Sequence, residues 1–370
     1  MGADQRRARH EALVRALAAE ELDGLLVTSR ANIRYLTGFS GSAALVMVTR
    51  ADVLLVTDFR YDEQARAEAG AVARVEVEST SVWDRFFKEL ATLGPLTWLG
   101  YEAHVLTVRD AERLGTGGAA KAWRWKATTE LVERLRAAKD AGEVAAIRSA
   151  AALAGEALRH TLALVRPGMT ELEIAGLLEG ALRRLGSEGH PFPTIVASGP
   201  RTALPHARSS GRAVAPLGGG GEWLLLDFGA QVDGYCADIT RTVLVGGRAT
   251  ERQRVLYGLV YEAQQRARAG VRAGMSGRDA DALARDLIAA RGLGDAFGHS
   301  LGHGLGLEVH EAPRLSKTNA EPLPEGAVVT VEPGVYLAGD GGVRIEDDVH
   351  LAREGPELLS DGRTELLELV

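Results

Sequence analysis

The chain has very little cysteine and no long apolar run. Cys236 is the only cysteine among 370 residues, so no disulfide can form within the chain, and this suits a reducing compartment. No run of about 18 apolar residues occurs, which argues against a membrane-spanning helix. Residues 1–24 also lack the apolar core of a signal peptide. These absences predict a cytoplasmic protein that does not interact with membranes.

Basic residues are fewer than acidic residues in this chain. The chain has 43 Lys and Arg against 50 Asp and Glu, a net charge of −7 at pH 7. A net negative charge argues against binding to nucleic acid or to an anionic membrane. With 46% hydrophobic and 25% charged residues, the composition is that of an ordinary globular protein, and the length allows two domains.

The first third of the chain alternates apolar strand-like runs with short amphipathic segments. The predicted strands are 23–28, 43–49, 52–58 and 73–79, and the predicted helices are 61–69, 82–90 and 108–114. This alternation predicts an α/β domain with a mostly buried sheet. From residue 127 to 165 the texture changes to one long alanine-rich helical pattern. We therefore place two domains at 1–125 and 126–370.

The second domain contains a weak internal repeat. Residues 165–186 resemble residues 271–292, and each segment has a turn, a Thr or Ser suited to cap a helix, and then that helix. Thr170 with Glu173 makes a full capping box. Strand-pair patterns follow each helix. The pattern predicts an α+β domain of two similar halves related by a pseudo-twofold repeat, with a pocket between them.

Each of the two predicted hairpins, 222–246 and 327–351, carries one acid on each strand. These acids are Asp227, Asp238, Glu332 and Glu346. Any one of them alone would be read as an ordinary strand-end or turn residue. Four acids brought together beside buried apolar runs would repel one another unless cations compensated their charge. Their symmetric placement indicates a site for two divalent metal ions, with some carboxylates bridging.

Three histidines stand in the short stretch "GHSLGHGLGLEVHE", residues 298–311: His299, His303 and His310. The stretch is too rich in glycine for a helix, and it lacks the Glu of the H-E-x-x-H zinc motif. It is therefore predicted as a strand or loop. A single histidine is usually structural or exposed, but three in twelve residues before paired acids indicate either a metal site or a catalytic loop.

Several motifs, in their order along the chain, resemble the M24 metallopeptidase family. They are "LLLDFGA", "DGYCADITRT", "GHSLGHGLGLEVHE", "VEPGVY" and "VRIEDD". The similarity is closest to the Xaa-Pro branch, which contains prolidase and aminopeptidase P. "ANIRYLTGFSGS" and "TDFRYDEQA" are similar to the family's N-terminal creatinase-like α/β domain. The resemblance implies that residues 126–370 form the α+β pita-bread catalytic domain.

The resemblance also implies which residues form a dinuclear metal centre. The family's five ligands match Asp227, Asp238, His303, Glu332 and Glu346. Asp227 would hold one ion, His303 and Glu332 the other, and the remaining two acids would bridge. An oxygen-rich donor set favours Mn²⁺, although Zn²⁺ and Co²⁺ are also compatible.

The implied activity is hydrolysis of the Xaa-Pro bond in short peptides that have proline at the second position. His206 and His310 match substrate-side histidines, Glu332 would handle the proton, and His299 and Arg344 would line the site. Xaa-Pro dipeptidase (prolidase) is the favoured activity, with aminopeptidase P next. Methionine aminopeptidase and a non-catalytic peptide-binding module are the alternatives, and the large N-terminal domain argues against the former. The family also implies a homodimer.

A dipeptidase must recognise the carboxylate just beyond the proline, for which arginine is the natural partner. Arg344 stands two residues before the proposed ligand Glu346, so the carboxylates of the metal ligands would occupy its guanidinium. Arg34 and Arg60 of the N-terminal domain are the remaining candidates from the sequence.

Overall fold

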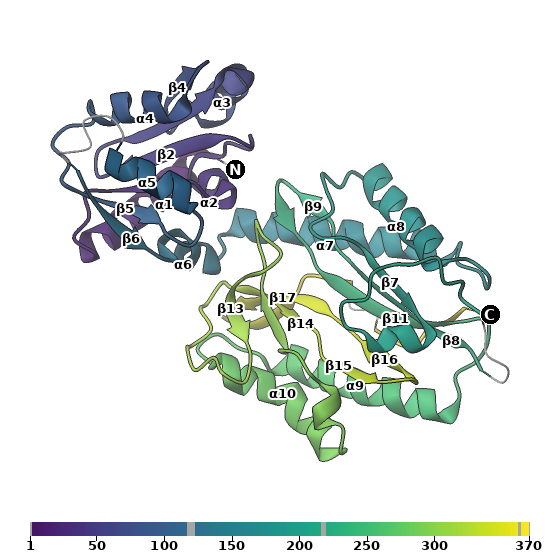
Figure 1. The fold of residues 1–370 in the computed structure, drawn as a ribbon. Helices are drawn as coiled ribbons and strands as arrows, with labels where there is room; N and C mark the ends of the chain where they lie inside the picture. The colour runs from purple at the N-terminus through teal and green to yellow at the C-terminus, as the bar shows by residue number, and fades with distance from the viewer. Residues whose placement is uncertain (1, 117–122, 216–219, 362–363, 370) are drawn as a thin grey trace. The chain divides into compact units, whose positions relative to one another are not determined.

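The computed structural model describes residues 2–116, 123–215, 220–361 and 364–369. The chain divides into two compact units, Met1–Arg136 and Ala137–Val370 (Figure 1). Within the described ranges, no helix combines the length and the apolar character that crossing a membrane requires.

The first unit is built on a six-stranded mixed sheet in the order β4-β3-β2-β1-β5-β6. Its strands are β1 (Gly24–Val27), β2 (Ala44–Thr49), β3 (Val53–Asp58), β4 (Arg74–Glu78), β5 (Trp98–Glu102) and β6 (Arg124–Thr128). Its helices are α1 (Ala3–Ala19), α2 (Arg30–Thr37), α3 (Asp62–Ala69), α4 (Val82–Leu90), α5 (Val108–Thr116) and α6 (Leu131–Ala137). The predicted strands and helices are confirmed.

Alternate side chains of the sheet pack against α4 and α5. Leu26, Leu54 and Val56 lie in one apolar cluster with Phe86 and Leu114, as expected when successive strand residues point to opposite faces. Helix α2 was not among the predicted elements. It begins where the Ser29 side chain accepts a hydrogen bond from Asn32 N, and it ends at Gly38 in the left-handed region.

The second unit contains four long helices and thirteen strands in its described residues. The helices are α7 (Ala141–Leu162), α8 (Glu171–Leu185), α9 (Glu251–Gly270) and α10 (Gly277–Ala290). The strands are β7 (Ile195–Ser198), β8 (Glu222–Phe228), β9 (Gln231–Val232), β10 (Tyr235–Cys236), β11 (Ile239–Val245), β12 (Gly302–Gly304), β13 (Glu311–Leu315), β14 (Val328–Val331), β15 (Gly334–Leu337), β16 (Gly341–Arg344), β17 (Asp347–Ala352), β18 (Gly355–Leu358) and β19 (Glu368–Leu369).

The helices lie on two sides of the strands, with α7 and α8 on one side and α9 and α10 on the other (Figure 1). The first pair packs on the sheet β19-β11-β8-β7, where Ile174 and Leu178 meet Leu226 and Phe228. The second pair packs on the sheet β13-β12-β14-β17-β18 and on the hairpin β15-β16. Each half therefore has its own apolar core, and the strands of both halves lie between the helix pairs.

The two helix starts of the repeat lie where the sequence predicts them. Thr170 caps α8 and exchanges hydrogen bonds with Glu173, and Ser276 caps α10. The predicted single helix from 127 to 165 is wrong, because β6 and the two helices α6 and α7 occupy this stretch. The break follows from Asp140, whose carboxylate accepts hydrogen bonds from Gly142 N at 2.9 Å and Glu143 N at 3.0 Å and so starts a new helix.

Candidate functional site

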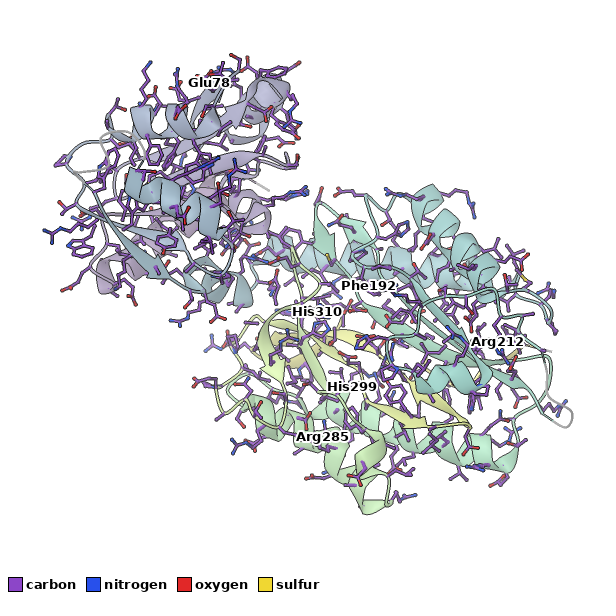
Figure 2. The ribbon with its side chains drawn as sticks, viewed as in Figure 1. Glu78, Phe192, Arg212, Arg285, His299 and His310 are labelled. Atoms are coloured by element: carbon purple, nitrogen blue, oxygen red, sulfur yellow. The ribbon has the colours of Figure 1, made fainter. Side chains whose placement is uncertain are left out.

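A cavity of about 760 Å³ lies in the second unit and is lined by residues of both halves. The metal ligands and site residues that the family resemblance implies all contribute to its wall: His206, Asp227, Asp238, His299, His303, His310, Glu332, Arg344 and Glu346. Figure 2 labels His299 and His310 together with Phe192, which lines the same cavity. The residues singled out from four separate stretches of sequence thus share one site.

The two hairpins bring the acids together. Asp227 lies on β8 opposite Thr240 of β11, and Asp238 immediately precedes β11. In the second half, Glu332 immediately follows β14 and Glu346 immediately precedes β17, which is antiparallel to β14. The backbone N–H of Glu346 donates to Thr240 O at 3.1 Å. This bond joins the second hairpin to the first, so the acid-bearing ends of both hairpins meet.

Asp238 and Glu346 are buried, Asp227 and Glu332 are partly buried, and burial is costly for the charged form of an acid. Asp238 is 6% exposed and Glu346 is 2% exposed. Burial and, after it, the neighbouring carboxylates raise the pKa of both groups well above the ordinary values. Burial likewise raises the pKa of Glu332 to about 8. Without a compensating cation, the cluster is therefore disfavoured in its ionised form.

His303 is oriented as a ligand rather than as an acid. Its Nδ1 lies 3.1 Å from Gly304 O, so Nδ1 carries the proton and the lone pair is on Nε2. Nε2 faces Asp238 Oδ2 at 3.8 Å and Glu332 Oε1 at 3.4 Å. Burial lowers the pKa of His303 to about 3, so the ring is neutral at pH 7. A neutral imidazole fixed through its other nitrogen is the usual form of a metal-bound histidine.

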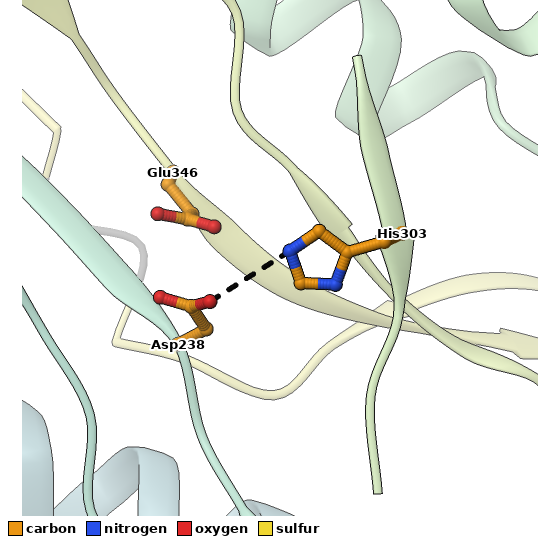
Figure 3. A group of neighbouring side chains, drawn as sticks. All are labelled: Asp238, His303 and Glu346. Atoms are coloured by element: carbon orange, nitrogen blue, oxygen red, sulfur yellow. Dashed lines mark ion pairs between the residues drawn. The ribbon is translucent and has the colours of Figure 1, made fainter. Parts of the chain in front are cut away.

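Three of the side chains fit a divalent cation particularly well. Asp238, His303 and Glu346 each offer one ligand atom, and these atoms all lie within 4.8 Å of one another (Figure 3). Asp238 Oδ1 is buried and has no hydrogen-bond partner among the described residues. A buried carboxylate oxygen without a donor is expensive unless something else binds it. Carboxylate oxygens with one imidazole are a suitable donor set for Mn²⁺, Zn²⁺ or Co²⁺.

Hydrogen bonds from neighbouring side chains hold the acids in place. Thr240 Oγ1 donates to Glu346 Oε2 at 2.6 Å, and Thr330 Oγ1 donates to Glu332 Oε1 at 3.3 Å. Neither threonine was singled out from the sequence, although each is only two residues from a predicted ligand. Such contacts fix the direction in which a carboxylate presents its lone pairs.

Arg344 is fully engaged by the protein. Its Nη2 donates to Asp227 Oδ2 at 2.5 Å, its Nε to Thr240 Oγ1 at 3.1 Å, and its Nη1 to Tyr336 Oη at 2.8 Å. The residue is only 3% exposed. Arg344 therefore orients Asp227 and has no free donor pair with which to hold a substrate carboxylate.

His299 is the end of a hydrogen-bonded chain that begins at Arg344. Because Arg344 donates to Tyr336 Oη, the tyrosine proton is directed to His299 Nε2 at 2.8 Å, and His299 Nδ1 donates to Ser300 O at 2.8 Å. Burial lowers the pKa of His299 to about 4. Both ring nitrogens are thus occupied by the protein, and the ring is a fixed, neutral part of the wall. Tyr336 was not identified from the sequence.

Helix α10 holds the segment that carries His299. Arg285, labelled in Figure 2, donates to His299 O at 2.6 Å and to Phe297 O at 2.8 Å. It also pairs with the buried Asp281. Asp281 in turn accepts from Leu301 N at 2.9 Å. An ion pair on one helix thereby sets the backbone on both sides of His299.

His310 and His206 also line the cavity, and no hydrogen bond from either ring occurs among the described residues. His310 lies edge-on to His303, with 4.4 Å between ring centroids. Burial and then the charge of Arg314 lower the pKa of His310, so its ring is neutral and can donate one N–H. The ring of His206 has no hydrogen bond to any residue that the structure describes. Both rings are available to a bound molecule.

Arg314 is a site residue that the sequence did not reveal. It lies directly across the β12–β13 pairing from His303, and it lines the cavity. Cross-strand partners point to the same face of a sheet, so Arg314 and His303 face the cavity together.

Cys236, in contrast, is buried, and burial raises the pKa of its thiol to about 12. A thiol in this environment stays protonated near neutral pH.

Comparison with known proteins matches each part of the chain to a family model. Residues 145–353 match the metallopeptidase family M24, and residues 9–138 match the creatinase/prolidase N-terminal domain. An uncharacterized peptidase, YqhT, from Bacillus subtilis is 39% identical over 94% of this chain and 96% of its own length.

Two solved structures of similar identity carry different activity names. An Xaa-Pro dipeptidase from Bacillus anthracis has a TM-score of 0.92 and 38% identity, covering 98% of this chain and 100% of its own. An X-Pro aminopeptidase from Thermotoga maritima has a TM-score of 0.88 and 38% identity, covering 96% and 100%. The predicted creatinase-like and pita-bread architecture is confirmed. With its buried acid and histidine cluster, the chain belongs to the M24 metallopeptidases that carry a creatinase/prolidase N-terminal domain.

Proposed function

We propose that the protein removes the N-terminal residue from short peptides whose second residue is proline, using two divalent ions. The observation that carries this proposal is the buried cluster of acids and His303 at the wall of one cavity, in a chain of this family. Asp227, Asp238, His303, Glu332 and Glu346 are the proposed ligands, and Mn²⁺ is the proposed metal. Divalent ions in such a site lower the pKa of water and polarise a carbonyl oxygen.

We assign proton transfer, stabilisation of the developing oxyanion and substrate contact to side chains in and around the cluster. The Glu332 carboxylate receives the proton lost by the attacking water and passes it to the leaving proline nitrogen. His310, neutral and next to His303, donates a hydrogen bond to the oxygen that gains charge at the scissile carbonyl. His206 contacts the proline ring or its carboxylate.

Preference for proline has a physical basis in this cavity. A tertiary amide has no N–H, so an apolar wall can cover it without leaving a donor unsatisfied. Phe192, Pro193 and Ile195 supply apolar lining to the same cavity that His206 lines. An ordinary peptide bond in the same place would bury its N–H against these groups, at a cost of about 1–3 kcal/mol.

The preference for a dipeptide rather than a longer peptide is assigned to Arg314. Arg60 of the first unit is already held by Asp58 through two contacts of 2.9 and 2.8 Å. Arg314 faces the cavity, and no ion pair to its guanidinium occurs within the described ranges. Its charge lowers the pKa of both His303 and His310, which places it close to the proposed reaction centre. A guanidinium in this position can bind the carboxylate of the C-terminal proline.

The test compares Ala-Pro with its C-terminal amide. A hydrogen bond to a charged group contributes about 1.5–3 kcal/mol, so kcat/KM should favour the free dipeptide by roughly 10- to 150-fold. Arg314→Ala should abolish most of this ratio. Arg208→Ala, which removes another cavity-lining arginine, is the matched control and should retain it.

Two outcomes would contradict the assignment. If the wild type cleaves the amide and tripeptides as well as the dipeptide, aminopeptidase P is the better description. If the ratio survives Arg314→Ala but not Arg208→Ala, the clamp is Arg208.

The homodimer predicted from the family stays a prediction, for which sedimentation velocity is the direct measurement.

A further inference from the structure

The segment that carries His206 runs along the cavity from Ser198 to Ser210. It leaves β7, forms the 3₁₀ helix Gly199–Ala203, and then lines the cavity with Pro205, His206 and Arg208. Because the His206 ring makes no hydrogen bond within the described part of the chain, its position depends on the backbone that carries it. Whatever fixes this backbone therefore fixes His206.

Glu171 holds both ends of this segment. It is the first residue of α8 and is 0% exposed. Its Oε1 accepts from Ser198 N at 2.8 Å and Ser198 Oγ at 2.9 Å. Its Oε2 accepts from Ser210 N at 3.0 Å and Ser210 Oγ at 2.6 Å. One carboxylate thus closes a loop of chain whose ends are twelve residues apart.

The same carboxylate also reaches the middle of the segment. Arg201 Nε lies 3.1 and 3.2 Å from the two oxygens of Glu171. Arg201 Nη2 donates to Arg208 O at 2.5 Å. Glu171 therefore fixes Arg201, and Arg201 fixes the backbone two residues beyond His206.

We propose that Glu171 is the positioning residue for His206: it holds the substrate-facing segment in place from the outside of the site, without touching substrate or metal. The inference rests on the proposed function only in assigning His206 to the substrate. Charge-assisted hydrogen bonds to a fully buried carboxylate are strong and directional, and displacement of a substrate-contacting group by about 1 Å can cost roughly 100-fold in rate.

The first test compares Glu171→Gln with Glu173→Gln. Glutamine keeps the shape of Glu171 but turns one acceptor into a donor that faces the serine N–H and hydroxyl groups. Glu173 lies on the same helix, and among the residues that the structure describes its carboxylate bonds only to Thr170, so Glu173→Gln is the matched control. We expect kcat/KM for Ala-Pro to fall about 10- to 100-fold for Glu171→Gln, with metal content unchanged, and no fall for the control.

A double-mutant cycle separates positioning from general loss of structure. If Glu171 acts through His206, then Glu171→Gln should cost less than about threefold in a His206→Ala background. An equal loss in both backgrounds overturns the proposal, as does full activity of the single variant. If Glu171→Gln does not fold, Ser210→Ala removes one of the anchoring bonds and enters the same cycle with the same expectations.

Hydrogen exchange tests the anchor without any assay of activity. Amides of residues 199–209 should exchange faster in Glu171→Gln, while those of α9 and α10 should not change. Unchanged exchange in the segment would overturn the anchor. If the wild type does not cleave Xaa-Pro peptides, the proposed function fails, but the exchange result still decides whether Glu171 holds the segment.

Discussion

The metal-free protein should become more stable when Glu332 is replaced by glutamine. Burial raises the pKa of this carboxyl from 4.5 to about 8. Between these two values the folded state binds more protons at Glu332 than the unfolded state does, so the free energy of unfolding falls as pH rises. At pH 7 the loss spans 2.5 pH units at about 1.4 kcal/mol each, or roughly 3 kcal/mol.

Glutamine avoids this loss and can still accept the Thr330 hydrogen bond, which is long at 3.3 Å. We expect Glu332→Gln in chelator at pH 7 to gain about 2–3 kcal/mol, or roughly 5–10 °C in Tm. At pH 5 the gain should shrink below about 1 kcal/mol, because the unfolded carboxyl is then itself partly protonated. Glu321→Gln, at an exposed position, is the control and should show neither effect.

Added Mn²⁺ should make the wild type more stable than the Glu332→Gln variant. An ion at a thousand times its Kd stabilises the wild type by about 4 kcal/mol, whereas the variant has lost a proposed ligand and should gain less. The measurement is urea or thermal unfolding in chelator and in Mn²⁺ at both pH values. The reasoning is refuted if the variant gains nothing in chelator at pH 7, or gains equally at pH 5 and pH 7.

The other predictions concern individual ligands and the two central histidines. Asp238→Asn and Glu346→Gln should each nearly abolish activity while the circular dichroism spectrum is preserved, because each removes a proposed bridging carboxylate; full turnover by either metal-loaded variant would exclude that role. His303→Ala should lose metal, whereas His310→Ala should keep it and lose about 10²- to 10³-fold in kcat. Metal analysis of both purified histidine variants is the check, and equal metal loss would show that the two roles are not separate.

Much of the site could be predicted because its acids follow short-range patterns. Asp227 and Glu332 each come directly after or at the end of a buried apolar run, and Asp238 and Glu346 stand at the start of the return strands. A carboxyl in such a place conflicts with burial, and the conflict is visible in the sequence. Repetition of the conflict in both halves therefore predicts one shared site from the sequence alone.

The partners of these acids could not be predicted in the same way. Arg241 donates to Glu346 O and pairs with Asp347, more than a hundred residues away along the chain. Arg314 faces the cavity because it pairs with His303 across β12 and β13, in a ladder whose register shifts directly after this pair. Spacing along the chain carries no information about such a shift, so the arginine was missed.

Glu171 was missed for a different reason. An acid in the first turn of a helix is ordinarily explained by the helix dipole, and the neighbouring capping box of Thr170 and Glu173 already accounted for the helix start. The break between α6 and α7 was missed because another signal in the sequence masks it. Helical periodicity continues across Asp140, and only the contacts of its carboxylate show that a second helix begins there.

The central claim is metal-dependent cleavage before proline, and a substrate panel tests it most directly. Metal-free protein should be inactive, and loading with Mn²⁺, Co²⁺ or Zn²⁺ should restore hydrolysis of Ala-Pro and other Xaa-Pro peptides, with Mn²⁺ the best. Met-Ala-Ser should not be cleaved. Cleavage of Met-Ala-Ser in preference to Ala-Pro would indicate a methionine aminopeptidase. Failure to bind any of the three ions would contradict the metal centre and leave a peptide-binding module on the same fold.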